Sequence, residues 1–377
     1  MKIAVNTRHL INQKLGGIGW FTYEILKRIV IDHPENEFFF IFDRPYHEKF
    51  IFSKNVIPIV IFPPARHPIL WYWWFEHSLP KILEKIKPDI FLSMDGYLSL
   101  NTTVKQIAVI HDLSFEHYPL HFKWIERQYH LQYSRKFAIK ADRIITVSEY
   151  SKLDIIKTYN INPNKIDIVY NASNSIYFPL TQDQKKLAKE KYAEGNDYFI
   201  YIGALLPRKN IARLLKAFEK FKDQNQNKVK LLIVGAKFFN TKDIALTYKK
   251  HSYKSDIIFT GHLPENEINM ALGGSIALTY ISYFEGFGIP IVEAFNAEVP
   301  VITSNISSMP EVAGDAALLA DPFSIDSIAN AMQLIYSDEK LRNELIEKGR
   351  IRKNVFSWNI SADKVWHIIQ NEVNKIN

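Results

Sequence analysis

Two acidic side chains, Glu285 and Glu293, stand at the ends of the stretch EGFGIPIVE, with seven residues between them. Gly286 and Gly288 allow a tight turn with exposed backbone N–H groups, and Pro290 suits the first turn of a helix. Because an apolar run precedes this stretch, the pattern predicts a helix N-terminus at a strand end, where anions bind. Two carboxylates there could bracket a polyhydroxylated ligand. For Glu293 alone, the helix dipole is a sufficient alternative explanation.

A pair of adjacent cations, Arg208 and Lys209, lies in a second candidate loop, GALLPRKN. The loop begins at Gly203, where a strand-like run ends, and an amphipathic helical pattern follows it. Arginine offers a planar fork of donors and lysine a compact charge, which together suit a diphosphate. The alternative is a solvated pair at a helix start, although cations are unfavourable there without a compensating anion.

Two further loops could face a ligand from the first half of the chain. Gly16, Gly17 and Gly19 lie between the first strand and the first helix, where the backbone could approach a phosphate or an acceptor, although G-x-G-x-x-G is not matched. His111 follows a strand over 106–110 and could hydrogen-bond to hydroxyl groups; a structural histidine is the alternative. Ser148 is interpreted as the N-cap of the next helix.

Several kinds of chemistry are excluded. The chain has no cysteine, which excludes disulfides, thiol nucleophiles and Cys-ligated metal sites. It has no G-x-S-x-G, Walker A or H-E-x-x-H motif. Because Asp-x-Asp is also absent, we expect no metal and no cofactor, with Arg208, Lys209 and helix N-termini supplying positive charge instead.

The elements that must position these residues alternate between strand and helix patterns. Apolar runs without alternation suit strands buried on both faces of a parallel sheet. The strands are expected at 3–7, 37–42, 57–61, 89–93, 106–110, 143–147, 166–169, 198–202, 230–234, 257–260, 276–280, 299–302 and 317–319. The helices of the first half are expected near 18–31, 73–86 (interrupted by Pro80), 122–141 and 149–158.

This alternation predicts an α/β protein with two Rossmann-like domains that face each other across a cleft. We expect an N-terminal domain over 1–175 and a C-terminal domain over 176–358, with a linker region at 171–197. A helix within 359–377 has no strand after it and should pack back on the N-terminal domain. Ligands of such sheets bind beyond the carboxyl ends of the strands, where the candidate loops lie.

The formal net charge of +7 over 377 residues suits an anionic ligand or an anionic membrane surface. No nucleic-acid-binding module appears, so nucleic acid is not an expected partner. The N-terminus does not resemble a signal peptide, and the longest apolar run, Ile69–Phe75, is too short to span a membrane. We expect a cytoplasmic protein. The aromatic run 71–75 has two open interpretations, core packing or a peripheral contact of the N-terminal domain with the inner face of the membrane.

Over essentially its whole length the chain resembles the GT-B-fold glycosyltransferases of family 4. The resemblance rests on EGFGIPIVE (285–293), GALLPRKN (203–210), GGIG (16–19), HDLSF (111–115) and VSEYS (147–151). The chain departs from the family pattern at three places: Asn171-Ala172 where many members have Asn-Gly, Ile281 to Phe284 where many have Pro-Ser, and Glu298 in place of a small residue or glycine.

The resemblance implies a retaining enzyme that moves a hexose, with mannose as our choice, from a nucleotide diphosphate sugar. The implied acceptor is a glycan or a lipid-linked glycan in surface polysaccharide synthesis. Glu285 and His111 are the implied catalytic residues, in contact with the transferred sugar. The implied donor-binding residues are Arg208 and Lys209 (diphosphate), Glu293 (ribose), Phe287 and Gly288 (backbone N–H groups to the sugar), Gly203, Gly16 and Gly17.

Two alternatives stay open. One is a non-catalytic subunit that binds a nucleotide sugar, although such relatives usually lose a motif glutamate or the Arg-Lys pair. The other is a nucleotide-sugar epimerase or hydrolase on the same fold, which would need an acid–base partner for Glu285.

Overall fold

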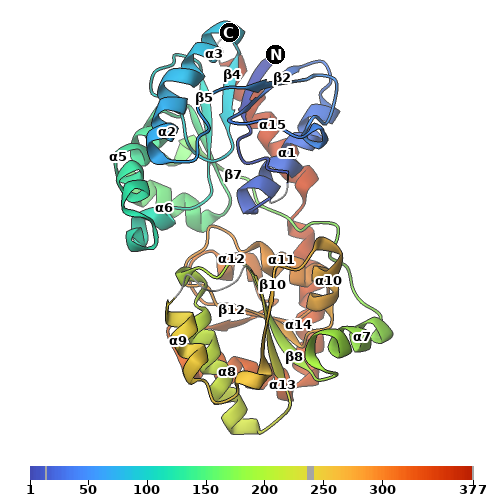
Figure 1. Cartoon of the computed structure of the whole chain (residues 1–377). Coiled ribbons are helices and arrows are strands. Elements are labelled where there is room, and N and C mark those ends of the chain that lie inside the picture. Colours follow the sequence, from blue (N-terminus) through green and yellow to red (C-terminus); the bar gives the residue numbers. More distant parts are fainter. Residues whose placement is uncertain (13–14, 236–241, 376–377) are drawn as a thin grey trace. The chain divides into compact units, whose positions relative to one another are not determined.

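The computed structural model describes residues 1–12, 15–235 and 242–375. They form two compact units, one comprising Met1–Asn171 with Ser357–Asn377 and the other Ala172–Phe356. The predicted boundaries, after residues 175 and 358, fall a few residues too late along the chain. Each unit is built on a parallel sheet with helices packed around it (Figure 1). The two Rossmann-like α/β domains expected from the sequence are therefore present.

The first unit, called the N-terminal unit, has a sheet of seven parallel strands in the order β3-β2-β1-β4-β5-β6-β7. The strands are β1 (Lys2–Asn6), β2 (Glu37–Phe42), β3 (Val56–Val60), β4 (Ile90–Ser93), β5 (Gln106–Ile110), β6 (Arg143–Thr146) and β7 (Ile166–Ile168). The central strands β4 and β5 are buried along their whole length, which explains their unbroken apolar runs. The strand order reverses between β1 and β4, the point at which such sheets bind ligands.

The helices of the N-terminal unit are α1 (Gly17–Asp32), α2 (Pro68–Trp73), α3 (Leu79–Ile86), α4 (Ser114–His117), α5 (Trp124–Lys140), α6 (Glu149–Tyr159) and α15 (Trp358–Asn374). Short 3-10 helices cover Glu48–Phe50, Pro119–His121 and Pro163–Lys165. As predicted, Ser148 caps α6, its hydroxyl accepting the Ser151 N–H at 3.0 Å.

The aromatic run is divided between core and surface. The helix begins at Pro68 rather than near residue 73 and continues through a π-helical turn, Trp74–Ser78, into α3. Pro80 does not interrupt it: it lies in the first turn of α3, directly after the π-helical turn. Trp74 and Phe75 are fully buried, whereas Trp73 is 55% exposed. Core packing thus holds for one end of the run.

The last helix, α15, packs against α1, as the sequence predicts (Figure 1, red and dark blue). The rings of Phe21 and Trp358 meet edge to face at 6.0 Å. His33 stacks on Trp366 at 3.9 Å, and Arg28 Nε donates to Asn359 Oδ1 at 2.7 Å. Both an apolar seam and polar contacts therefore make α15 part of the N-terminal unit.

The second unit, called the C-terminal unit, has a six-stranded parallel sheet in the order β10-β9-β8-β11-β12-β13. The strands are β8 (Tyr198–Ile202), β9 (Lys230–Val234), β10 (Ile257–Gly261), β11 (Ala277–Tyr280), β12 (Val301–Ser304) and β13 (Leu318–Ala320). The helices are α7 (Gln182–Ala193), α8 (Ile211–Asn225), α9 (Lys242–Lys250), α10 (Glu265–Gly273), α11 (Ile289–Asn296), α12 (Met309–Ala313), α13 (Ile325–Ser337) and α14 (Glu339–Arg352), with 3-10 helices at Pro207–Lys209, Lys254–Asp256 and Lys353–Val355. Here the strand order reverses between β8 and β11.

The sequence predicts that the polar segment 171–197 is a linker, and this prediction is wrong. From Ala172 onward it belongs to the C-terminal unit. The Phe178 N–H donates to Asn269 Oδ1 at 3.2 Å, and Leu180 packs so closely on Gly273 that a Cβ there would lie 2.6 Å from its Cγ. The helix α7 is the charged helical piece expected within it. Across the described residues, no helix is both long and apolar enough to cross a membrane.

Candidate functional site

Three loops meet at the carboxyl ends of neighbouring strands in the C-terminal unit. One follows β8 and carries Arg208 and Lys209, one follows β11 and carries Glu285, and one follows β12. β8 and β11 are the strands between which the strand order reverses. The loops therefore lie where an open parallel sheet has its ligand crevice.

The centre of this site is a buried ion-paired cluster. Glu285 Oε2 lies 2.7 Å from Arg208 Nη1, and Glu285 Oε1 lies 2.5 Å from Lys209 Nζ. Glu285 is only 6% exposed. Burial opposes its ionisation, but the two cations outweigh burial and lower the pKa of Glu285 to about 2. The carboxylate expected to face a sugar is thus joined to the cations expected to face a diphosphate.

The two loops are also held together by backbone bonds. The Tyr283 N–H donates to the Arg208 carbonyl at 3.0 Å, and Arg208 Nη1 donates to the Phe284 carbonyl at 2.9 Å. Lys209 Nζ lies 2.5 Å from the Tyr280 hydroxyl and 4.8 Å from the centre of its ring. These contacts fix both cations in place. Two positive charges against one carboxylate leave the cluster with one net positive charge.

A pair of serines after β12 clamps the Glu285 loop. The Ser307 hydroxyl accepts the Glu285 N–H at 3.0 Å and donates to the Glu285 carbonyl at 2.7 Å. The Ser308 hydroxyl lies 2.9 Å from the same carbonyl and 2.8 Å from that of Phe287. Sequence reasoning missed both residues. Their signal was two adjacent serines just after a buried strand, the position of the other candidate loops.

Glycine is required at two places in these loops. Gly288, the N-cap of α11, has a φ of +106°, and Gly203 has a φ of +151°. A third glycine, Gly235 at the end of β9, was not predicted: a Cβ there would lie 2.1 Å from the Gly203 carbonyl oxygen. Phe287 packs its buried ring edge to face on Phe356, with 5.4 Å between the ring centres.

Glu293 is in the middle of α11 and is not a member of the ion-paired cluster. Burial of its carboxyl raises its pKa to about 7, and a hydrogen bond with the Tyr177 hydroxyl only partly offsets this. Tyr177, which was not predicted, precedes α7 and has its own pKa raised by burial and by Glu293. The two glutamates of the motif therefore differ in charge state near neutral pH, with Glu285 fully ionised and Glu293 only partly so.

This difference predicts a pH-dependent effect of Glu293→Gln on stability. Because the pKa of Glu293 is raised on folding, ionisation destabilises the fold as pH rises from about 4.5 to about 7. The glutamine variant should be more stable than the parent by up to about 3 kcal/mol at pH 8 and nearly equal to it at pH 4. Urea unfolding at both pH values measures this, and the same difference at pH 4 and pH 8 would contradict it.

In the N-terminal unit, His111 follows β5 as predicted. Its Nε2–H donates to the Met94 carbonyl at 2.9 Å, and its ring meets Phe21 edge to face at 5.2 Å. Burial lowers the pKa of His111. The ring is therefore neutral near pH 7 with its lone pair on Nδ1, so it can accept a hydrogen bond from a hydroxyl group.

The glycine loop before α1 is only partly constrained by packing. Gly16 is the N-cap of α1 and Gly17 its first residue. A Cβ on Gly16 would meet nothing within 4 Å, whereas one on Gly19 would lie 2.9 Å from the His9 carbonyl oxygen. Packing within this unit thus requires a glycine at 19 but not at 16.

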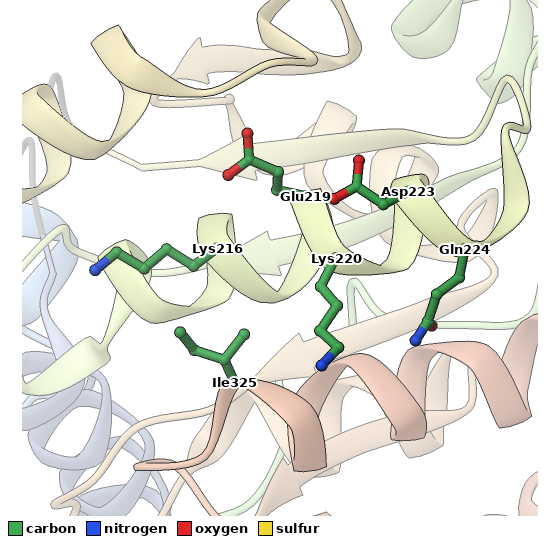
Figure 2. Close-up of a pocket in the computed structure, with 6 residues that line it drawn as sticks. All are labelled: Lys216, Glu219, Lys220, Asp223, Gln224 and Ile325. Atoms are coloured by element: carbon green, nitrogen blue, oxygen red, sulfur yellow. The ribbon is translucent and has the colours of Figure 1, made fainter.

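A surface groove elsewhere in the C-terminal unit is not a second candidate for the functional site (Figure 2). It has a volume of about 580 Å³ and is lined by side chains of α8 and by Ile325. Three of its charged groups have protein partners: Lys220 with Asp326 at 2.7 Å, Glu219 with the Ser252 N–H at 2.7 Å, and Asp223 with the Tyr253 hydroxyl at 2.8 Å. In the part of the chain that the structure describes, no three His, Asp or Glu side chains are grouped so that they could hold a metal ion.

Comparison with known proteins matches both halves of the chain to family models. Residues 182–352 match the glycosyl transferases group 1, and residues 15–174 match the Glycosyltransferase Family 4. Among curated proteins, the chain is 27% identical to the O-antigen chain mannosyltransferase B of Escherichia coli, over 95% of this chain and 96% of that protein. It is also 27% identical to the O-antigen chain mannosyltransferase RfbU of Salmonella typhimurium, over 77% and 78% of the two chains.

Solved structures share the fold at lower identity. HepE of Anabaena in complex with UDP and glucose superposes with a TM-score of 0.76 at 17% identity, over 98% of this chain and 99% of that one. WaaG, a glycosyltransferase involved in lipopolysaccharide biosynthesis, superposes with a TM-score of 0.75 at 15% identity, over 97% and 99%. With both halves matched and the fold shared over nearly its whole length, the chain belongs to the GT-B glycosyltransferases of the group 1, family 4 type.

Proposed function

We propose that this glycosyltransferase moves a hexose from a nucleoside diphosphate sugar to a glycan or lipid-linked glycan acceptor in surface polysaccharide synthesis. Mannose is the hexose that we propose. The observation that carries this proposal is the Glu285–Arg208–Lys209 cluster at the strand reversal of the C-terminal unit. Mannose and polysaccharide synthesis are supported by the names of the two O-antigen mannosyltransferases it is similar to. The family resemblance adds retention of configuration at the anomeric carbon.

The cluster suits the leaving group of this reaction. As the bond between the sugar and the diphosphate breaks, negative charge grows on the phosphate oxygens. Arg208 and Lys209 are held rigidly, and α11 begins at Ile289 with the positive end of its dipole at Gly288. Fixed charges of this kind stabilise the departing diphosphate without rearrangement.

The remaining motif residues would hold the other parts of the donor. Glu293 would accept hydrogen bonds from the ribose hydroxyls, and Glu285 would contact the sugar together with the N–H groups of Phe287 and Gly288. On the acceptor side, the neutral His111 would accept a hydrogen bond from a sugar hydroxyl, with Gly16 and Gly17 near the ligand. The intact Glu285, Arg208 and Lys209 favour an active enzyme over a non-catalytic binding subunit.

We expect transfer to continue in excess EDTA. The reason is that Arg208, Lys209 and the α11 N-terminus already offset the charge of a diphosphate, so a metal would be redundant there. The measurement is turnover of the correct donor with EDTA, compared with added magnesium or manganese. Activity lost in EDTA and restored only by a metal would show that carboxylates outside the proposed site bind it.

The proposed function is tested by a donor screen. Thermal stabilisation by UDP, GDP and ADP identifies the nucleotide, since a ligand at 100 times its dissociation constant stabilises the fold by about 2.7 kcal/mol. Transfer from the corresponding sugar donors to glycan and lipid-linked acceptors then follows, with the anomeric configuration of the product read by NMR. GDP-mannose should give the largest response and an α-linked product. An inverted product, or no transfer from any donor, would overturn the proposal.

We also propose a cytoplasmic location with a peripheral contact on the inner face of the membrane. The membrane contact is motivated by the aromatic run, in which Tyr72 is 38% and Trp73 55% exposed. Flotation with anionic vesicles tests it, and Trp73→Ser should weaken any binding.

A further inference from the structure

Tyr177 and Glu293 are far apart in the sequence but are joined inside the C-terminal unit. The Tyr177 hydroxyl donates a hydrogen bond to the carboxyl group of Glu293. Tyr177 is only 8% exposed, whereas Glu293 is intermediate between buried and exposed. The donor is thus held within the unit, while the residue that it contacts keeps part of its surface accessible to a ligand.

Glu293 lies on the accessible face of α11. Ile289, Glu293 and Asn296 follow one another at helical spacing, and all three are partly exposed. The buried positions of the helix are Ile291, Val292, Ala294 and Phe295. Because α11 begins at Ile289 and each residue rises about 1.5 Å, Glu293 lies about 6 Å along the axis from the helix N-terminus. A nucleotide with its diphosphate at that N-terminus would have its ribose, the next group along, beside Glu293.

The backbone on both sides of Tyr177 is anchored. Before it, a turn forms in which the Tyr177 N–H donates to the Asn174 carbonyl at 3.3 Å and the Ile176 N–H donates to Asn174 Oδ1 at 3.2 Å. After it, the Phe178 N–H donates to Oδ1 of the buried Asn269 at 3.2 Å, and Asn269 Nδ2 donates to the Phe178 carbonyl at 3.2 Å. The Tyr177 hydroxyl is therefore a fixed donor that can restrain the side chain it contacts.

A carboxyl group restrained in this way suits a pair of neighbouring hydroxyl groups. Tyr177 has a single hydroxyl hydrogen, so it occupies one acceptor position of Glu293 and leaves the others to a ligand. Burial raises the pKa of Glu293, and further hydrogen-bond donors would favour its ionised form. The two ribose hydroxyls of a nucleotide are such donors. A site built to bind hydroxyl groups rejects an analogue that lacks them, because its own polar group is then left without partners.

Resting on the proposed contact of Glu293 with the ribose, we propose that Tyr177 is the positioning residue for Glu293 and makes the donor site selective for ribonucleotides over deoxyribonucleotides. The Tyr177 hydroxyl holds the Glu293 side chain in the orientation in which its carboxyl group meets both ribose hydroxyls. Without that hydroxyl, the carboxyl group turns more freely, and ordering it on the ribose costs more conformational entropy.

The test is calorimetric titration of the parent and of Tyr177→Phe with UDP, GDP and ADP, and with the dideoxyribose form of each. Tyr177→Phe keeps the ring and removes only the hydroxyl. For the nucleotide that the parent binds, we expect the variant to weaken binding of the ribose form about tenfold and to leave the dideoxyribose form within about twofold of the parent. A purely structural role of Tyr177 would weaken binding of both forms equally.

Tyr192→Phe is the matched control. Tyr192 is also 8% exposed, and its hydroxyl also contacts a carboxylate, Glu267 Oε2 at 3.1 Å, outside the proposed site. This variant should bind both forms of the nucleotide as the parent does. Glu293→Ala provides a second control, because Tyr177 is proposed to act through the Glu293 carboxyl group. Adding Tyr177→Phe to Glu293→Ala should cause no further loss of affinity for the ribose form.

Equal losses for the two forms in Tyr177→Phe, or no loss for either, would overturn the role of Tyr177 and leave the proposed function intact. If Tyr177→Phe does not fold, Asn269→Ala decides in its place: it releases the Phe178 backbone and should also reduce the preference for the ribose form, and an unchanged preference would overturn the proposal. A parent that binds both forms equally would overturn the ribose contact of Glu293 as well. A parent that binds none of the three nucleotides and transfers no sugar would overturn the proposed function itself.

Discussion

Glu285→Gln is expected to lower the rate of sugar transfer by two to three orders of magnitude, the range for loss of a fixed electrostatic group at the reacting centre. The affinity for the nucleoside diphosphate should not fall. It should rise at low salt, because Arg208 and Lys209 lose the carboxylate that they contact at 2.7 and 2.5 Å. Single-turnover rates and calorimetry at two salt concentrations measure these opposite effects.

The same variant should be less stable, since removing one partner of a buried ion pair leaves an uncompensated charge. A loss of about 3 kcal/mol is expected in urea unfolding at pH 7. Glu298→Gln is the matched control: its carboxylate also pairs with an arginine, Arg350, at 2.6 Å, but that arginine is 45% exposed and outside the site. Full activity in Glu285→Gln would remove Glu285 from the catalytic site.

The double variant Arg208→Ala/Lys209→Ala should weaken nucleoside diphosphate binding by about two to four orders of magnitude. Each charge-assisted contact contributes about 1.5–3 kcal/mol, and each 1.4 kcal/mol is roughly tenfold in affinity. Since the lost contacts are ionic, the difference between variant and parent should shrink as salt is raised. The measurement is calorimetric titration with UDP, GDP and ADP.

Lys216→Ala/Lys220→Ala on α8 is the matched control, because it removes the same charge from the groove of Figure 2. It should leave nucleotide affinity within a few-fold of the parent. Equal affinity in the parent and the Arg208/Lys209 variant at low salt would mean that the two cations serve only to hold Glu285.

Much of the fold follows from the chain's local pattern. β5 (QIAVI) and β8 (YFIYI) are fully buried strands, and their unbroken apolar runs are what a two-sided parallel sheet requires. The prediction that Pro80 interrupts a helix was wrong. A proline within a helical pattern has the same sequence signal whether it ends a helix or lies in the first turn of a helical segment. Segment 171–197 looked like a linker because its contacts with Asn269 and Gly273 are distant in sequence and leave no local pattern.

The candidate site was predictable in its parts but not in its pairing. Gly203, Gly288 and the two cations were visible as residue types beside strand ends, since parallel strands bring such loops together. That Glu285 contacts Arg208 depends on a separation of 77 residues along the chain. Arg8 and Asp95 are 87 residues apart, so their ion pair leaves no local pattern in the sequence. Without that pair, the sequence does not indicate whether either side chain is solvated or buried.

One departure from the family pattern has a local explanation. Glu298 stands where a small residue or glycine is usual, and its φ of +55° is in the left-handed region that favours glycine. Its ion pair with Arg350 compensates for part of that cost. The departure therefore changes a turn after α11 and no group of the proposed site.

The position of α15 has a consequence for synthesis of the chain on the ribosome. The C-terminal unit, Ala172–Phe356, is continuous in sequence, whereas the N-terminal unit needs Ser357–Asn377 to cover α1. Although its seven strands emerge first, that unit cannot bury Phe21 against Trp358 until the whole C-terminal unit has been synthesised. The C-terminal unit, although synthesised second, can therefore finish folding before the N-terminal unit. Until α15 has been synthesised, the N-terminal unit leaves an apolar face of α1 uncovered, and it is therefore the part of the chain most in need of a chaperone.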